Sequence, residues 1–190
     1  MIIIKRILLL MGILMVSVGI IPSQAVQSRS TTVYLPGVFY SHDTGFMNPG
    51  FESGTDGWVV QSNQGDNLVS TANARSGVRS AALGNGSDYR LASIAQQVEV
   101  PQQAYVATYF QWVESLELCA SNNNRVTVIV NGQPYQHYNI CQDSDNGKWV
   151  EIKIYLAHYR GQTVVFRLEF ESSTILNNYL YVDDFSFQLP

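Results

Sequence analysis

The chain carries little positive charge. Lysine and arginine together number 11 in 190 residues, against 15 aspartates and glutamates. Two of the basic residues, Lys5 and Arg6, belong to an N-terminal segment described below, so the remainder has a net charge near 9 − 15 = −6. Nucleic acids and anionic membrane surfaces attract basic proteins, and this balance argues against both as partners of the mature chain.

Familiar catalytic motifs are also missing. The sequence has no G-x-S-x-G elbow, no H-E-x-x-H pair and no phosphate-binding loop. His42, His137 and His158 are scattered without metal-ligand spacing. Glu169 and Glu171 share one predicted strand face, and carboxylate pairs occur in glycosidases. A solvated charged face is the simpler interpretation, so we expect no enzyme activity and keep a glycan hydrolase or lyase as an alternative.

Cysteine is scarce, since Cys119 and Cys141 are the only two. Between them, residues 125–130 and 133–140 have strand patterns separated by Asn-Gly, a strong signal for a tight hairpin turn. Such a hairpin brings the ends of its two arms together, and with them the two cysteines. An isolated pair in an exported chain is typical of a disulfide, which would stabilise the fold by about 3 kcal/mol.

Residues 1–25 have the organisation of a secretory signal peptide. Two basic residues precede an apolar run at 7–21, and Ser-Gln-Ala at 23–25 is a small-residue cleavage site. The run is shorter than the roughly 18–20 residues that a spanning helix needs. We therefore predict secretion to the extracellular space or the cell surface, with an uncleaved membrane anchor as the alternative. Residues 26–47 would be a leader that includes a possible edge strand at 33–36.

Long amphipathic helical patterns are absent, and alternation with a period of two dominates the rest of the chain. Residues 150–156 and 164–170 each place apolar side chains on one face and charged ones on the other, as strands of antiparallel sheets do. About nine short strands joined by Gly, Asn and Ser turns predict an all-β protein. The expected architecture is a two-sheet antiparallel β-sandwich (jelly roll) in one domain over residues 48–190.

The last predicted strand changes its apolar face part-way along. The apolar face changes between Val182 and Phe185, where Asp183 and Asp184 are located. A β-bulge would account for the change and would turn one carboxylate toward the sheet interior or its rim. A carboxylate between apolar neighbours is costly to bury unless a cation meets it. We expect a calcium ion, with Glu52 supplying a second carboxylate; in the alternative, both aspartates end a strand and face water.

Several short motifs follow one another along the chain. They are Asn-Pro-Gly-Phe-Glu at 48–52, Gly-Trp at 57–58, Ser-Gly at 76–77 with Ser80, Ile-Ala-Gln-Gln-Val-Glu-Val-Pro at 94–101, Gly-Gln-Thr-Val at 161–164 and Tyr-Val-Asp-Asp-Phe at 181–185. In this order they resemble the motifs of galactose-binding-like jelly-roll domains, and among these the carbohydrate-binding modules of secreted bacterial proteins. The resemblance spans residues 48–189, and because each motif is short, their order and spacing carry the weight.

The resemblance implies a structural calcium ion near both ends of the domain. Its side-chain ligands would be Glu52 and Asp183, with Asp184 as the substitute if the register differs, and backbone carbonyls would complete the six to eight oxygens that Ca²⁺ takes. Such an ion would stabilise the fold by about 2.7 kcal/mol at a hundredfold excess over its dissociation constant.

The resemblance also implies sugar binding through aromatic side chains, at positions that vary among members. Strand faces make Tyr109 and Gln111 the first candidates, with Trp112, Tyr135 and Tyr138 as further ones, although aromatic side chains also pack cores. The predicted function is an exported, non-catalytic module that binds carbohydrate or a cell-surface glycan. The alternative is an extracellular structural or protein-interaction module of the same fold without a sugar site, and the sequence does not indicate an oligomeric state.

Overall fold

A computed structural model describes residues 45–86, 89–121, 123–143, 145–173 and 176–189. The predicted signal peptide, nearly all of the predicted leader and the possible edge strand at 33–36 lie outside these residues. Among the residues described, no helix is long and apolar enough to cross a membrane.

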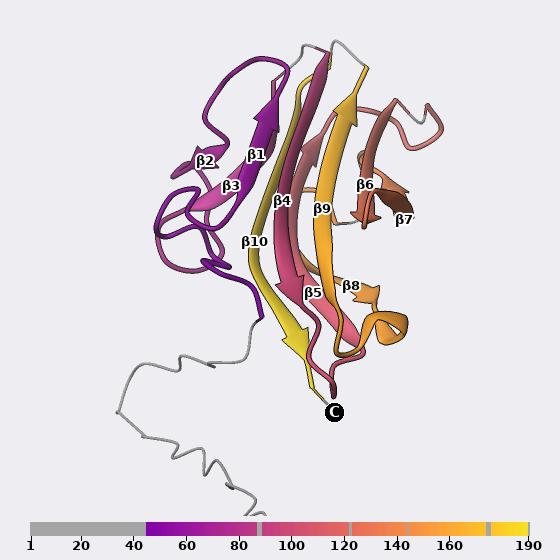
Figure 1. Cartoon of the computed structure of the whole chain (residues 1–190). Helices are drawn as coiled ribbons and strands as arrows, with labels where there is room; N and C mark the ends of the chain where they lie inside the picture. Colours follow the sequence, from indigo (N-terminus) through magenta and orange to yellow (C-terminus); the bar gives the residue numbers. More distant parts are fainter. Residues whose placement is uncertain (1–44, 87–88, 122, 144, 174–175, 190) are drawn as a thin grey trace, which may run out of the picture. The chain divides into compact units, whose positions relative to one another are not determined.

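The described chain folds into two five-stranded antiparallel sheets that face each other (Figure 1). Sheet A has the order β1-β4-β9-β6-β7, and sheet B has the order β2-β3-β10-β5-β8. The predicted two-sheet sandwich is therefore confirmed. The elements are β1 (Val59–Ser62), β2 (Val69–Ser70), β3 (Ser80–Gly86), β4 (Arg90–Glu99), β5 (Val106–Ser115), β6 (Asn124–Val130), β7 (Gln133–Asn139), β8 (Trp149–Tyr155), a short 3-10 turn (Ala157–Tyr159), β9 (Thr163–Ser172) and β10 (Asn178–Gln188).

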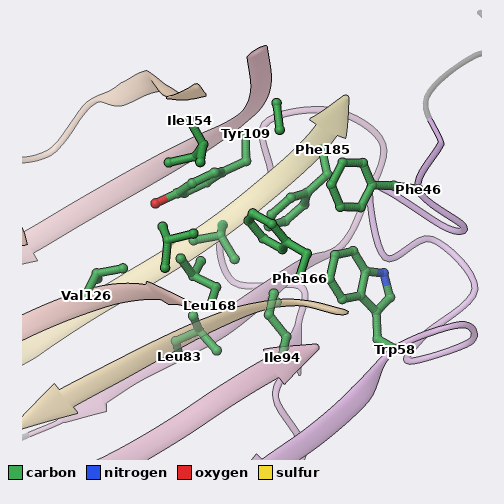
Figure 2. Packing of buried hydrophobic residues seen from close by; sticks show 14 of the residues in the cluster. Phe46, Trp58, Leu83, Ile94, Tyr109, Val126, Ile154, Phe166, Leu168 and Phe185 are labelled. Carbon is green, nitrogen blue, oxygen red and sulfur yellow. The ribbon is translucent and has the colours of Figure 1, made fainter. Parts of the chain in front are cut away.

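Aromatic rings fill one part of the core between the sheets, as Figure 2 shows. Phe185 lies at their centre, with its ring centroid 4.9 Å from that of Trp58 and 5.5 Å from that of Phe46. Phe166 approaches the same ring edge-on at 6.1 Å. Elements from both sheets and from the segment before β1 contribute to this cluster, so it joins the start and the end of the described chain.

The hairpin of β6 and β7 confirms the prediction from the Asn-Gly pair. Val130 lies opposite Gln133, and the two residues between them, Asn131 and Gly132, have φ angles of 51° and 77°. Positive φ at both central residues is the geometry that favours Asn-Gly in such turns. The predicted disulfide is present as well, with the Cα atoms of its two cysteines 4.9 Å apart. It links the loop after β5 in sheet B to the segment after β7 in sheet A.

The predicted irregularity in the last strand is also present. The register of β10 against β5 shifts between Asp183 and Ser186, and Asp184 has a φ of 53°. The extra residue turns Phe185 into the core and leaves Asp183 fully buried. The bulge thus both packs Phe185 into the core and positions the two aspartates.

Candidate functional site

Asp183 binds the backbone of the loop that precedes β3. Its Oδ2 accepts hydrogen bonds from the backbone N–H of Arg75 at 2.9 Å and of Ser76 at 3.3 Å. Its Oδ1 accepts one from the N–H of Asp184 at 2.8 Å. Burial, together with the negative charge of Asp184, raises the pKa of Asp183 to about 6.

Asp184 and Glu52 bind the same loop through other groups. Asp184 forms an ion pair with the guanidinium of Arg75 at 2.6 Å and accepts a hydrogen bond from the hydroxyl of Ser76 at 2.6 Å. Glu52 Oε1 accepts from the backbone N–H groups of Val78 and Arg79, each at 2.9 Å. The first motif and the last strand therefore meet at residues 75–79, with Asp183 and Asp184 at one end and Glu52 at the other.

These three carboxylates match calcium in chemical type, because Ca²⁺ takes hard oxygen ligands. They are not oriented as in a preformed calcium site, because Asp183 Oδ2 and Glu52 Oε1 each accept hydrogen bonds from two backbone N–H groups. Within the described part of the chain, no group of three or more His, Cys, Asp or Glu side chains is arranged to hold a metal ion. A bound calcium would thus need backbone carbonyls for much of its coordination.

Tyr109, the first sugar-binding candidate, lies in the core. It is 1% exposed, and its ring stacks on that of Phe185 with centroids 5.1 Å apart. The ring faces are covered by protein, so Tyr109 is not a platform for a sugar. The cause is the orientation of β5, whose face with Ala107 and Tyr109 turns inward.

The opposite face of β5 carries an aromatic row that crosses three neighbouring strands. Trp112 lies directly opposite Tyr181 of β10 on one side and Trp149 of β8 on the other. The rings of Trp112 and Trp149 are 6.0 Å apart at an interplanar angle of 62°. Both tryptophans are partly exposed and Tyr181 is 9% exposed. We call Tyr181, Trp112 and Trp149 the aromatic row.

Polar groups border the aromatic row on both sides. Glu114 pairs with Tyr179 in the next cross-strand position, and both lie close enough to Tyr181 to raise its pKa, although burial is the larger cause. On the other side, Glu151 accepts a hydrogen bond from Gln188 Nε2 at 2.8 Å. The row therefore combines flat apolar rings with carboxylate acceptors at its borders.

The remaining candidates occupy two different places. Gln111 and Tyr138 both line a cavity between the edges of the two sheets. Tyr135 lies outside that cavity, 38% exposed, where its hydroxyl donates to the backbone carbonyl of Tyr155 and its ring contacts Tyr159 edge-on. Of these three sequence-predicted candidates, the structure brings Gln111 and Tyr138 together and places Tyr135 apart from them.

Sheet A presents a charged outer surface. Glu169 pairs with Arg167 at 2.8 Å, and Glu171 pairs with Arg125 at 2.6 Å. Each glutamate thus has its own arginine partner, which supports the interpretation of this face as a solvated charged surface.

Trp149 and Tyr181 are the two members of the aromatic row that sequence reasoning missed. Each alternates with inward-facing neighbours in its own strand, which is a local signal that the residue points away from the core. Their position beside Trp112 depends on which strands pair and in which register. That information is not contained in any single strand.

Comparison with known proteins identifies the fold. No protein-family model and no curated protein matches the sequence. Among solved structures, the chain is similar to the module TmCBM61 in complex with β-1,4-galactotriose, with 17% identity, a TM-score of 0.58 and coverage of 77% of this chain and 99% of that one.

Two further similar structures have lower identity. A cleaved adhesin domain of Lys-gingipain from Porphyromonas gingivalis has 11% identity and a TM-score of 0.53, with 75% of this chain and 97% of that one covered. A non-crystalline cellulose-specific module, CBM28, has 13% identity and a TM-score of 0.50, with 75% and 93% covered. At these identities the likeness concerns the fold: the chain has the β-sandwich fold found in carbohydrate-binding modules.

Proposed function

We propose that this protein is a non-catalytic carbohydrate-binding module whose sugar-binding surface is the aromatic row. The observation that carries the proposal is the alignment of Tyr181, Trp112 and Trp149 across three adjacent strands, on the face away from the core. Neighbouring strands lie about 4.8 Å apart, so the row extends over roughly 10 Å. The length of the row suits a short stretch of a glycan chain, and because the rings of Trp112 and Trp149 are inclined at 62°, successive sugar rings would pack on them at different angles. The fold itself, shared with carbohydrate-binding modules, supports the same function.

The chemistry of the row suits neutral glycans. The C–H faces of a sugar ring pack on flat aromatic rings, and its hydroxyls donate hydrogen bonds to acceptors such as Glu114 and Glu151 at the borders. Glu151 is paired with Lys153 at 3.4 Å, so Glu114 and the overall excess of acidic residues are what repel anionic polysaccharides. We therefore expect uncharged chains to bind and uronic-acid polymers to be rejected.

A glycan array followed by calorimetry with Trp112→Ala tests the proposal. Aromatic anchors at binding surfaces typically contribute 2 kcal/mol or more, so we expect affinity for the best array ligand to fall by about 30-fold. Tyr89→Ala is the control, because Tyr89 is an aromatic residue that is 53% exposed and lies outside the row. Undiminished binding by Trp112→Ala would contradict the proposal.

A structural or protein-interaction role is the second candidate. Exposed aromatic residues are also enriched at protein–protein interfaces, so the aromatic row would suit a protein partner. A blank array from folded protein would favour this role.

We also propose that the module works outside the cell. The disulfide supports this location, because such bonds persist in oxidising compartments and are rare in reducing ones. The signal-peptide pattern at residues 1–25 points the same way.

Calcium completes the proposal as a structural ion at residues 75–79. Glu52, Asp183 and Asp184 all bind this loop, with the two aspartates of the last strand at one end of it and Glu52 of the first motif at the other. An ion there would join both ends of the domain without taking part in sugar binding. Its presence is tested by unfolding the protein with excess calcium and with a chelator: a higher stability in calcium supports the ion, and equal stability contradicts it.

A further inference from the structure

The side chain of Arg75 lies on the same outer face of sheet B as the aromatic row. Its guanidinium carbon is 3.4 Å from the centre of the Phe110 ring. Phe110 precedes Trp112 by two positions in β5, and residues two apart in a strand share a face. The Cα atoms of these two residues are therefore about 7 Å apart, so one ligand can contact both the row and Arg75.

Two contacts hold the guanidinium of Arg75 in place. Its Nη1 pairs with Asp184 Oδ2 at 2.6 Å. At 3.4 Å from the centre of the Phe110 ring, the guanidinium lies flat on that ring, because an edge-on approach would push a nitrogen into it. A long side chain normally loses rotamer freedom when it binds a ligand, and that loss weakens binding. Arg75 has already lost this freedom in the folded protein.

The rest of the guanidinium is available to a ligand. Among the described residues, Nε and Nη2 have no hydrogen-bond partner, and the side chain is 38% exposed. These two nitrogens form the fork of parallel donors with which arginine binds paired oxygen acceptors. The loop does not need them as an anchor, because the backbone N–H of Arg75 and the hydroxyl of Ser76 already bind the two aspartates of β10.

The charges around Arg75 favour neutral acceptors over a carboxylate. The ion pair with Asp184 already offsets the positive charge of the guanidinium. Two further carboxylates, those of Asp183 and Glu151, lie opposite Phe110 on the neighbouring strands. An anionic ligand would meet these negative charges as well as the arginine. Two hydroxyls on adjacent carbons of a sugar ring, in contrast, present two neutral acceptor oxygens side by side, as the fork requires.

We propose that Arg75 is a specificity-determining residue of the sugar-binding surface, and that its Nε and Nη2 donate to two adjacent hydroxyls of the sugar ring on Trp112. This role rests on the proposed function. Glu114 follows Trp112 by two positions on the same face of β5, so the ring on Trp112 has an acceptor on one side and the arginine donors on the other. Because the donors are fixed in position, they distinguish sugars by the configuration of these hydroxyls.

The test is calorimetric titration with three neutral chains whose sugars differ in the configuration of one or two hydroxyls: cellotetraose, β-1,4-mannotetraose and β-1,4-galactotetraose. We expect wild-type protein to prefer one of them. Arg75→Gln should lower the affinity for the preferred chain by about tenfold and reduce the preference, because the other chains do not present the same hydroxyl pair. Arg75→Lys keeps the charge but lacks the fork, so it should lose affinity similarly.

Arg125→Gln is the matched control. Arg125 is also an exposed arginine paired with one carboxylate at 2.6 Å, but it lies on the outer surface of sheet A, so its replacement should leave all three affinities unchanged. Urea denaturation of each variant separates binding from folding. Arg75→Gln should unfold nearly as wild type does, because exposed ion pairs contribute little to stability. A merely structural role of Arg75 would weaken all three chains equally and leave the preference as it was.

The possible failures are distinguishable. Full affinity in Arg75→Gln, full rescue by Arg75→Lys, or an unchanged preference would overturn the role of Arg75 alone, provided that Trp112→Ala still abolishes binding. Binding of trigalacturonate that is tighter than that of the neutral chains and is lost in Arg75→Gln would also overturn it, because Arg75 would then bind a carboxylate. Wild-type protein that binds none of the three chains would overturn it as well. Binding that survives Trp112→Ala would contradict the aromatic row and the role of Arg75 together.

Discussion

Asp183 gives the protein an unusual dependence of stability on pH when calcium is absent. Its pKa in the folded state is about 6, against an ordinary value of 3.8, because the carboxyl is buried beside Asp184. Between these two values the folded state holds a proton that the unfolded state has released. In a chelating buffer, lowering the pH from about 7 to about 4 should therefore stabilise the fold, and the gain should be complete once the pH is below the unfolded pKa.

The magnitude follows from the difference between the two pKa values. A difference of about 2 pH units corresponds to at most about 3 kcal/mol at roughly 1.4 kcal/mol per unit. Solvent screening and relaxation of the surrounding loop reduce this value, so we expect a gain of about 1–2 kcal/mol. Asp66 does not mask the effect: burial raises its pKa, but hydrogen bonds from Ser62 and Arg90 outweigh that and hold it below 3.8. The stability that ionised Asp66 contributes is lost as the pH falls through its folded-state pKa, which lies below 3.8.

The assay is urea denaturation at several pH values, in a chelator and in excess calcium. A calcium ion at this site favours the charged form of Asp183 and lowers its pKa, so the same acidification should destabilise the calcium-loaded protein. Asp183→Asn should flatten both profiles, whereas Asp56→Asn, a change at an exposed aspartate, should leave them unaltered. Loss of stability on acidification in the chelator would refute the reasoning about Asp183, and identical profiles in both buffers would refute the calcium proposal.

Two further predictions concern the framework. Reduction of the Cys119–Cys141 bond, or replacement of both cysteines by serine, should lower the free energy of unfolding by about 3 kcal/mol, because the bond closes a loop between residues 22 apart in the sequence; chemical denaturation that shows no change would contradict this. Phe185→Ala should cost about 3–5 kcal/mol, because the ring is buried at the centre of the aromatic cluster. A loss below about 1 kcal/mol in the same assay would show that the cluster does not depend on this ring.

Local patterns in the sequence were sufficient to predict several features of the fold. The alternation of apolar and charged residues indicated the sandwich, and the Asn-Gly pair placed the hairpin that brings Cys119 and Cys141 together. The change of apolar face between Val182 and Phe185 indicated the bulge in β10. In each case the signal lies within one strand or one turn, where side-chain direction follows directly from residue spacing.

The candidate site could be predicted only in part, because it depends on pairing between distant strands. Both faces of β5 carry apolar bulk, so its sequence does not reveal that Tyr109 turns inward and Trp112 outward. Trp149 and Tyr181 join Trp112 through cross-strand register with β8 and β10, which no local pattern encodes. Gln111 and Tyr138 were both predicted from strand faces, but their shared cavity depends on how the edges of the two sheets approach.

The most direct test of the account is a crystal structure of the protein with a neutral oligosaccharide chosen from the glycan array. We expect sugar rings packed along Trp112 and Trp149, with hydroxyls hydrogen-bonded to Glu114 or Glu151. A chain bound instead across the charged outer face of sheet A, with the aromatic row bare, would contradict it.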